Sequence, residues 1–353
     1  MEETRVGFLR QMVAAPSPSG FEQPVQAVIG KEMKKYADKV QTDVMGNTIG
    51  LLNPKGSPRI MLAGHCDEIG FMVRHITDEG YIYIAPIGGI DTQVMNCQRV
   101  VIHNAKGPVF GVVGRKAIHL MSAEDRKKVA EFHDLWIDIG AKNKKDALTR
   151  VSIADPITFA VGLDRLGHDI VVSRGLDDKM GAFVVVEVLR LLAKAKIKAA
   201  VCGVSTVQEE IGLRGAHTSA FGLDPELAIA IDVTFSSDHP GTEKTKSGDI
   251  KLGKGPVLHL GANINPVVGK LLIDTAKAEK IPYQMLAAPS ATGTDANAIQ
   301  LSRTGVATAL VAVPLRYMHT PAEVLSLDDL ENAAKLIAAF IKRLKPGMSF
   351  LPV

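Results

Sequence analysis

The sequence predicts an α/β fold, with an open sheet flanked by helices and interrupted by a small domain of β-strands. Helical patterns and apolar strands alternate in residues 1–67 and again from about residue 166, as in α/β sheets. Short Gly-bounded strand patterns instead follow one another in residues 68–165. A chain of 353 residues with 46% hydrophobic residues can form two domains. We therefore expect a discontinuous α/β domain, residues 1–67 and 166–353, and an inserted β domain, residues 68–165.

The first α/β segment leads to a histidine. Residues 3–14 and 25–33 are predicted as helices, and residues 40–52 as strands interrupted at Gly46-Asn47. The apolar run 58–64 is predicted as a strand that ends at His65-Cys66-Asp67. Alternate residues of an extended chain share a face, so His65 and Asp67 suit a metal-binding imidazole oriented by a carboxylate. A histidine at a strand end is, however, more often a hydrogen-bonded polar residue than a metal ligand.

The middle of the chain is rich in short strand patterns. Alternating segments predict strands at 69–76, 81–86, 98–103, 107–114, 135–140 and 157–159. A basic segment, residues 115–132, interrupts them and predicts a short helix from Ser122. Strands at this spacing without long helices between them favour a small barrel or sandwich.

The second α/β segment repeatedly places acidic residues after strands. The strand 168–174 leads to Asp177-Asp178 at the start of a long helix, where Asp178 suits an N-cap. The apolar strand 199–204 leads to Glu209-Glu210, and the strand 226–231 leads to Asp232. In open α/β sheets, ligands collect beyond the carboxyl ends of the strands, so these acids are expected to converge.

The end of the chain adds a second histidine. The apolar strand 307–315 leads to His319, and an amphipathic helix is predicted over 326–344, with a cap formed by Ser326 and Asp329.

Two imidazoles and three carboxylates form a candidate ligand set: His65, Asp177, Glu210, Asp232 and His319. Such a set suits two divalent ions, roughly 3.5–4 Å apart, that share one carboxylate. Glu209 is left over and suits the role of general base for an activated water. An isolated Glu-Glu pair would more often lie in a solvated loop, so this interpretation depends on the neighbouring ligands.

Composition excludes several other classes. The formal net charge of +3 comes without long blocks of one sign, which argues against a nucleic-acid or membrane-surface partner. Three cysteines, Cys66, Cys97 and Cys202, show no zinc-knuckle spacing and fit a reducing cytoplasm. The most apolar predicted helix, residues 182–193, is too short and too charged to span a bilayer.

Five segments resemble the M42 family of metallo-aminopeptidases, the tetrahedral aminopeptidases. They are His65-Cys66-Asp67, residues 175–179, residues 208–215, Ile231-Asp232-Val233 and residues 316–319, and further similarity extends over nearly the whole chain. The resemblance implies a zinc-peptidase-like open mixed sheet and an inserted barrel or PDZ-like domain for dimerisation. It also implies an aminopeptidase that uses two ions per subunit, zinc or cobalt, to hydrolyse short peptides. The enzyme would be cytoplasmic and would assemble from dimers into a dodecamer.

The resemblance also implies a role for each site residue. His65 and Asp232 would bind one ion, Glu210 and His319 the other, and Asp177 would bridge them. Glu209 would be the base and Asp67 a partner of His65. The Asp177–Asp178 peptide bond is expected to be cis.

The resemblance leaves the substrate pocket open. Residues 291–297 stand where the family usually has a run of glycines before Thr-Asp, and Arg214, Asp295 and Thr320 are candidate pocket residues. Two alternatives from other classes are a glycoside hydrolase (endoglucanase) and a non-enzymatic metal-binding scaffold. Glycosidases need two acids about 5–9.5 Å apart across a sugar, and Trp136 is the single tryptophan available for stacking on sugars. A structural metal site would have no use for the spare Glu209.

Overall fold

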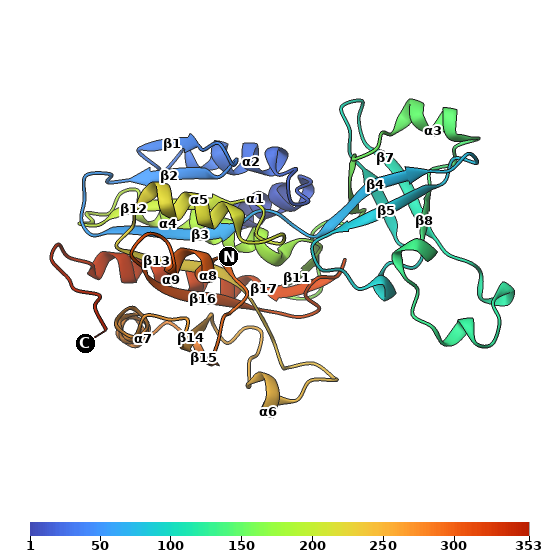
Figure 1. Cartoon of the computed structure of the whole chain (residues 1–353). Helices are drawn as coiled ribbons and strands as arrows, with labels where there is room; N and C mark the ends of the chain where they lie inside the picture. Colours follow the sequence, from blue (N-terminus) through green and yellow to red (C-terminus); the bar gives the residue numbers. More distant parts are fainter. Residues whose placement is uncertain (353) are drawn as a thin grey trace.

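The computed structural model describes residues 1–352, and it forms a layered α/β body from which a β-barrel projects (Figure 1). Within these residues, the open mixed sheet has eight strands in the order β1-β2-β12-β3-β13-β16-β14-β15. Six strands close the barrel in the order β4-β5-β8-β7-β6-β9, and β10-β11-β17 form a small third sheet. The predicted fold class, an α/β sheet with a small barrel, is confirmed.

The strands of the large sheet are β1 Lys39–Thr42, β2 Thr48–Leu52, β3 Arg59–His65, β12 Ala200–Thr206, β13 Leu227–Phe235, β14 Val257–Gly261, β15 Gln284–Ala288 and β16 Ala307–Leu315. Strands β12, β3, β13 and β16 are parallel neighbours. Their carboxyl ends therefore meet at one edge, which is where the candidate site lies.

Helices cover both faces of the large sheet. They are α1 Glu3–Ala14, α2 Gln23–Met33, α4 Leu176–Leu192, α5 Arg214–Leu223, α7 Pro266–Glu279, α8 Asp295–Gln300 and α9 Leu327–Arg343. The short α6 Lys244–Ser247 lies on a loop that projects away from the sheet (Figure 1). Alternate residues of β3 face opposite layers: Ile60 and Leu62 join the core beneath α1, α2, α4, α7 and α9, whereas Met61 and Ala63 join the core beneath α5 and α8.

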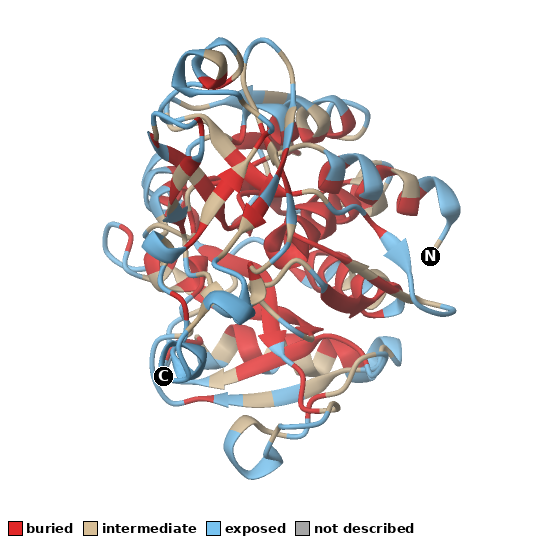
Figure 2. Cartoon of the chain, turned by 90° about the vertical axis from the view of Figure 1, so that its right-hand side faces the viewer, coloured by how far each residue is buried: buried red, intermediate tan, exposed pale blue. Residues whose placement is uncertain are grey.

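The barrel has its own core. Its strands are β4 Gly70–Ile76, β5 Ile82–Ile87, β6 Arg99–Ile102, β7 Val109–Gly114, β8 Trp136–Asp138 and β9 Pro156–Phe159, and α3 Lys144–Arg150 packs beside them. Figure 2 shows buried residues both in the α/β body and inside the barrel. The division at residues 67/68 and 165/166, and a role of the barrel in dimerisation, stay predictions.

Two local predictions are corrected by the structure. The predicted helix from Ser122 is a single 3₁₀ turn, Asp125–Lys127. Ser326 caps α9 by accepting from the amide of Asp328, but Asp329 does not complete a capping box. Its carboxylate instead accepts hydrogen bonds from the amides of Gly253 and Gly255, each at 2.7 Å.

The small sheet brings α4 to the site. Its strands are β10 Asp164–Arg165, β11 Ile170–Ser173 and β17 Glu323–Ser326. The peptide bond between Asp177 and Asp178 is cis, as predicted, and regular helical backbone begins after Asp178. The Asp178 carboxylate accepts from the amides of Gly181 at 3.1 Å and His65 at 3.0 Å, so it acts as the predicted cap and also attaches α4 to β3.

Candidate metal centre and active site

The predicted metal ligands come together at the carboxyl edge of the sheet. His65 ends β3, Glu209 and Glu210 follow β12, Asp177 lies at the start of α4, and His319 lies between β16 and β17. Asp232 was predicted to follow its strand but lies inside β13, which continues to Phe235.

Two groups of side chains can each hold a metal ion, and they share Asp177. The first is His65, Asp177 and Asp232, and the second is Asp177, Glu210 and His319. Asp177 Oδ1 lies 3.3 Å from His65 Nε2, and its Oδ2 lies 3.3 Å from His319 Nε2. One carboxylate therefore faces both imidazoles with different oxygens, as a bridging ligand would.

The carboxylate oxygens and imidazole nitrogens of the cluster are placed to bind cations, and hydrogen bonds between them do not satisfy every atom. Glu210 Oε1 lies 3.3 Å from His319 Nε2, yet this buried oxygen has no hydrogen-bond partner. Within residues 1–352, no Lys or Arg forms an ion pair with Asp177, Glu209, Glu210 or Asp232. Buried carboxylates need a compensating positive charge, and divalent ions would supply it.

The pKa values reflect this crowding. Burial raises the pKa of Glu209 to about 10; the charge of His65 opposes this effect and that of Asp232 adds to it. Burial also raises the pKa of Asp232 well above its usual range. Burial would raise the pKa of Asp177 too, but hydrogen bonding to His319 and His65 lowers it. Contacts with Asp177 and Glu210 raise the pKa of His319 to about 11.

Asp67 holds the loop that carries both glutamates. Its Oδ1 accepts from the amide of Glu209 at 3.1 Å, and its Oδ2 accepts from the amide of Glu210 at 3.2 Å. Oδ2 also accepts from Ser19 Oγ at 2.8 Å. Asp67 Oδ1 lies 3.4 Å from His65 Nδ1, which is closer to the backbone oxygen of Asp67, at 3.1 Å. The predicted contact with His65 is therefore accompanied by an anchoring role that the sequence did not reveal.

Two further groups position His319 and were not predicted. The Glu323 carboxylate accepts from the amides of both His319, at 2.9 Å, and Asp177, at 3.1 Å. The backbone oxygen of Gly89, between β5 and the following 3₁₀ turn, lies 2.8 Å from His319 Nδ1. A proton on Nδ1 leaves Nε2 free to bind a metal, which is the usual arrangement for a metal-ligating histidine. No sequence pattern near either group signals these contacts.

A cavity of about 290 Å³ opens beside the cluster. Besides cluster residues, its lining includes Val233, Thr234, Phe235, His259, Thr292, Gly293, Thr294, Leu310 and Met318. None of the predicted pocket residues lines it. Arg214 is exposed, Asp295 is buried against Thr206, and Thr320 bonds to the backbone of Tyr317. Their part in substrate binding stays a prediction.

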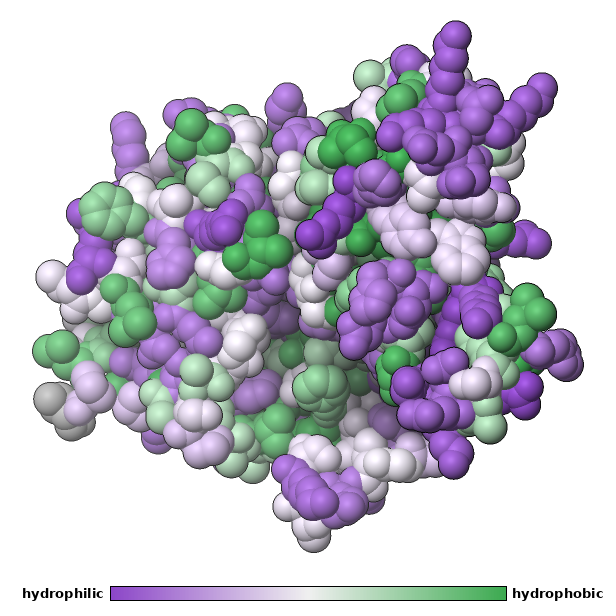
Figure 3. Space-filling view, turned by 45° about the vertical axis from the view of Figure 1, so that its right-hand side comes forward, coloured by the Kyte–Doolittle hydropathy of each residue, from purple (hydrophilic) through white to green (hydrophobic). Residues whose placement is uncertain are grey.

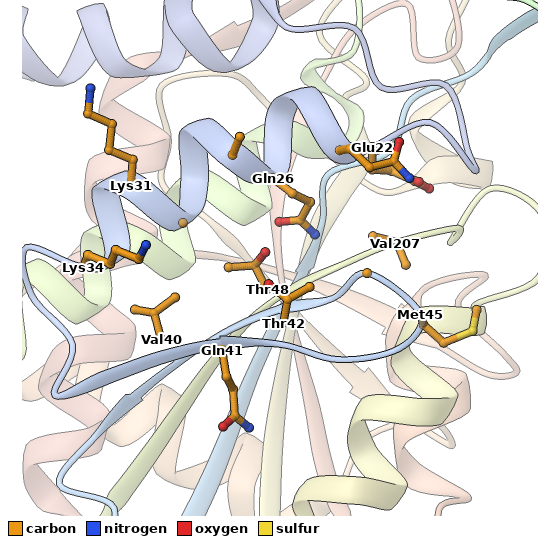
Figure 4. Close-up of a pocket in the computed structure, with 14 residues that line it drawn as sticks. Glu22, Gln26, Lys31, Lys34, Val40, Gln41, Thr42, Met45, Thr48 and Val207 are labelled. Carbon is orange, nitrogen blue, oxygen red and sulfur yellow. The ribbon is translucent and has the colours of Figure 1, made fainter.

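A second cavity, of about 580 Å³, lies between α2, β1 and β2 (Figure 4). In the close-up, Gln26 and Lys34 extend into the space beside Thr48, and Glu22 lies at the far end. Glu22 is the one carboxylate in this lining, and no imidazole accompanies it. This cavity therefore offers no metal set, and the chemistry is expected at the smaller one.

Comparison with known proteins shows the family of this chain. The sequence profile of the M42 glutamyl aminopeptidase family matches residues 46–336. A lysyl aminopeptidase of Pyrococcus furiosus is 37% identical, over 98% of this chain and 99% of its own length. The structure resembles a TET aminopeptidase from Thaumarchaeota archaeon SCGC AB-539-E09, with a TM-score of 0.93, 35% identity and coverage of 98% and 97%.

A second solved structure concerns assembly. It is the TET1 peptidase of Pyrococcus horikoshii, described as able to assemble into a tetrahedron or a large octahedral shell. Its TM-score to this chain is 0.85 at 34% identity, with coverage of 96% of this chain and 100% of the other.

Proposed function

Because this chain belongs to the M42 family of glutamyl aminopeptidases and is therefore a peptide hydrolase, we propose that it removes N-terminal residues from short peptides with two divalent ions per subunit. The observation that carries the proposal is Asp177, whose two oxygens face His65 and His319 at 3.3 Å each. His65 and Asp232 would hold one ion, Glu210 and His319 the other, and Asp177 both.

Each residue then has a task. When bound, the two ions would polarise the scissile carbonyl and lower the pKa of a water, so that it could attack the carbonyl once it gave up a proton. Glu209 belongs to neither ligand group, and its Oε2 lies 3.9 Å from His65 Nε2. Nearby cations favour the ionised form of a buried carboxylate, so with ions bound Glu209 would be ionised. It would then take the proton of the attacking water and deliver it to the leaving amine. Asp67 and Glu323 hold the backbone of the groups that bind and react.

The ion type and the oligomer complete the proposal. Mixed imidazole and carboxylate ligands suit zinc or cobalt. Dimers formed through the barrel, joined into a dodecamer, would confine the sites and restrict substrates to peptides.

None of the helices in residues 1–352 has the length and apolar character needed to cross a membrane.

One set of assays separates the rival functions. Metal-loaded protein should release amino acids from free peptides, but not from peptides with a blocked N-terminus, and should leave carboxymethyl-cellulose intact. Cleavage of the cellulose alone would favour the glycosidase alternative, and inactivity on all three substrates would favour a scaffold. The cluster argues against a glycosidase, because Asp177 and Glu210 face one imidazole rather than opposite sides of a sugar ring.

A further inference from the structure

The cavity beside the metal cluster has a wall without charged side chains. Apart from the six cluster residues, the lining is made of Val, Thr, Phe, His, Gly, Leu and Met. Its volume, about 290 Å³, is at the lower end of the range of small-molecule sites. It is thus suited to one side chain of a substrate held at the cluster.

His259 belongs to this wall because of strand register. Asp232 pairs with Ala312, and Ala312 pairs with Val257 of β14, so these residues form one row across the sheet. His259 is two residues after Val257 and therefore lies on the same face of the sheet as Asp232. A lone histidine in a short apolar run gave no sign of this position, and from the sequence it is expected to be structural or at the surface.

The imidazole of His259 has no hydrogen-bond partner within residues 1–352. Only 7% of the residue is exposed, and its Nδ1 is buried without a partner. Burial lowers the pKa of His259 to about 4, so the ring is neutral at pH 7. A neutral imidazole offers one donor and one acceptor, and buried polar groups are normally paired. The unpaired ring nitrogens of His259 therefore suit a ligand group that is polar but uncharged.

The loop that contains Thr292 and Thr294 uses its polar side chains in hydrogen bonds within the protein. Thr292 Oγ1 accepts from Asn263 Nδ2 at 2.8 Å and lies 2.9 Å from Thr294 Oγ1, while the amide of Thr292 donates to Asn297 Oδ1. This segment departs from the usual glycine run, and its hydroxyls are already engaged. Among the polar side chains of the wall, Thr234, on the same face of β13 as Asp232, and His259 are therefore left to recognise a substrate. His259 is the larger of the two and has a buried nitrogen without a partner.

From these contacts we infer that the wall forms the pocket for the substrate's N-terminal side chain, that it selects uncharged side chains such as Leu, Met and Gln, and that His259 is the specificity-determining residue, which hydrogen-bonds the amide of Gln. Lys and Glu side chains would enter without an opposite charge to pair with, which is costly in a buried site. This inference rests on the proposed aminopeptidase function.

Steady-state kinetics on aminoacyl-p-nitroanilides of Leu, Met, Gln, Lys and Glu would test the inference with the metal-loaded assembly. We expect kcat/KM for the three uncharged substrates to exceed that for Lys and Glu by at least about tenfold. A His259→Leu variant should lower the Gln-to-Leu ratio of kcat/KM about five- to tenfold. His259→Gln, which keeps a donor and an acceptor, should restore that ratio. His259→Glu should raise the Lys-to-Leu ratio.

Controls separate specificity from stability and from the proposed function. His168→Leu, at an exposed position between β10 and β11, should leave every ratio unchanged. Metal content and circular dichroism check that the His259 variants fold. Hydrolysis that favours Lys or Glu, or equal losses on all substrates in His259→Leu, would overturn the inference alone. Failure to hydrolyse any unblocked substrate would overturn the proposed function as well.

Discussion

Glu209 and Glu210 are adjacent in sequence but have different surroundings, so their variants should behave differently. Glu209→Gln keeps all five candidate ligands and removes the base, so we expect both ions to remain while kcat falls roughly 10²–10⁴-fold, with a smaller change in KM. Glu210→Gln should weaken one ion, and part of its activity should return at higher zinc or cobalt. The metal content of the purified variants and their kinetic constants, measured together, check these two expectations. Metal loss in the Glu209 variant alone would mean that the roles are reversed.

Glu323 should affect metal affinity without touching metal. Its carboxylate accepts from two amides, those of Asp177 and His319. The amide side chain of Glu323→Gln can accept from one of them but presents a donor to the other, so both ligands should shift. We expect metal binding about 10–100-fold weaker, measured by competition with a chelator. Glu124→Gln, at a side chain that is 84% exposed, is the matched control. Equal affinities in the two variants would exclude the positioning role.

Glu68 should show how a buried ion network depends on pH. Burial opposes ionisation of Glu68, but Arg174 and Lys179 outweigh it and lower its pKa from 4.5 to about 2. Above pH 4.5 the carboxylate is charged in both the folded and unfolded states, and its contribution to stability is complete. As pH falls from 4.5 towards 2 the unfolded state takes up the proton first, so the contribution is lost.

A Glu68→Gln variant tests this. At pH 7 it leaves Arg174 and Lys179 without their partner, so the free energy of unfolding should fall by about 3–5 kcal/mol. The difference between the variant and the parent should shrink between pH 4.5 and 2. Urea unfolding of the metal-free proteins measures both effects, because metal release at acid pH then plays no part. A difference independent of pH would contradict the assignment.

At the scale of elements, α4 approaches β3 through glycines. A Cβ on Gly64 would lie 2.3 Å from the backbone carbon of Gly181, so the helix start and the strand end pack without side chains between them. Gly64→Ala should separate them and move Asp177 away from His65. We expect a loss of about 1–3 kcal/mol in stability, and weaker metal binding.

A glycine without close neighbours provides the control for Gly64→Ala. Gly7 lies in α1, and a Cβ at this position would meet nothing within 4 Å, so Gly7→Ala should stabilise the protein by about 0.5–1 kcal/mol. Thermal unfolding of both variants measures the contrast. No loss of stability in Gly64→Ala, or an equal loss in Gly7→Ala, would contradict a role of the close backbone approach at Gly64.

Elements with a strong local pattern could be predicted from sequence. The apolar run 307–315 coincides with β16, and 3–14 coincides with α1, because burial on both faces or along one stripe leaves a clear pattern. The candidate ligands could also be predicted, since each ends or follows a strand pattern in the sequence and matches a family segment, although β13 continues beyond Asp232. Their roles as ligands and base stay predictions.

Elements and contacts that depend on distant partners could not be predicted. Strands β14 and β15 at the sheet edge were not individually recognised, and neither was α7 between them. Asp329 bonds to Gly253 and Gly255 rather than to its local cap, because folding brings these amides to the carboxylate. Glu323 and His259 gain their importance in the same way. Nothing within a few residues of either one shows what it will face.

At the scale of the whole molecule, the barrel should carry the assembly contact. Exposed apolar residues include Phe110 on β7, 68% exposed, and Leu120 in the segment between β7 and β8, 70% exposed. In Figure 3, hydrophilic side chains cover much of the barrel at the right, with single apolar ones between them. We expect the protein to sediment as an oligomer and not as a 37.8 kDa monomer. A variant that carries both Phe110→Glu and Leu120→Glu places charges in the expected contact, so its oligomer should dissociate.

Analytical ultracentrifugation measures this assembly. Val44→Glu, at a fully exposed turn between β1 and β2, should leave the oligomer intact. Retention of secondary structure by the barrel variant would show that dissociation is not unfolding. A monomeric parent protein at micromolar concentration would contradict the predicted assembly.

The Gly89 carbonyl that contacts His319 comes from the barrel side of the chain, whereas every candidate ligand comes from the α/β body. A shortened protein that joined residue 67 directly to residue 166 would keep all five ligands and Glu209. It would nevertheless lack the backbone oxygen that lies 2.8 Å from His319 Nδ1 and can accept a proton from it. The barrel therefore cannot be treated as a detachable accessory: an engineer who transplanted the α/β body alone would need to build a replacement oxygen for that imidazole.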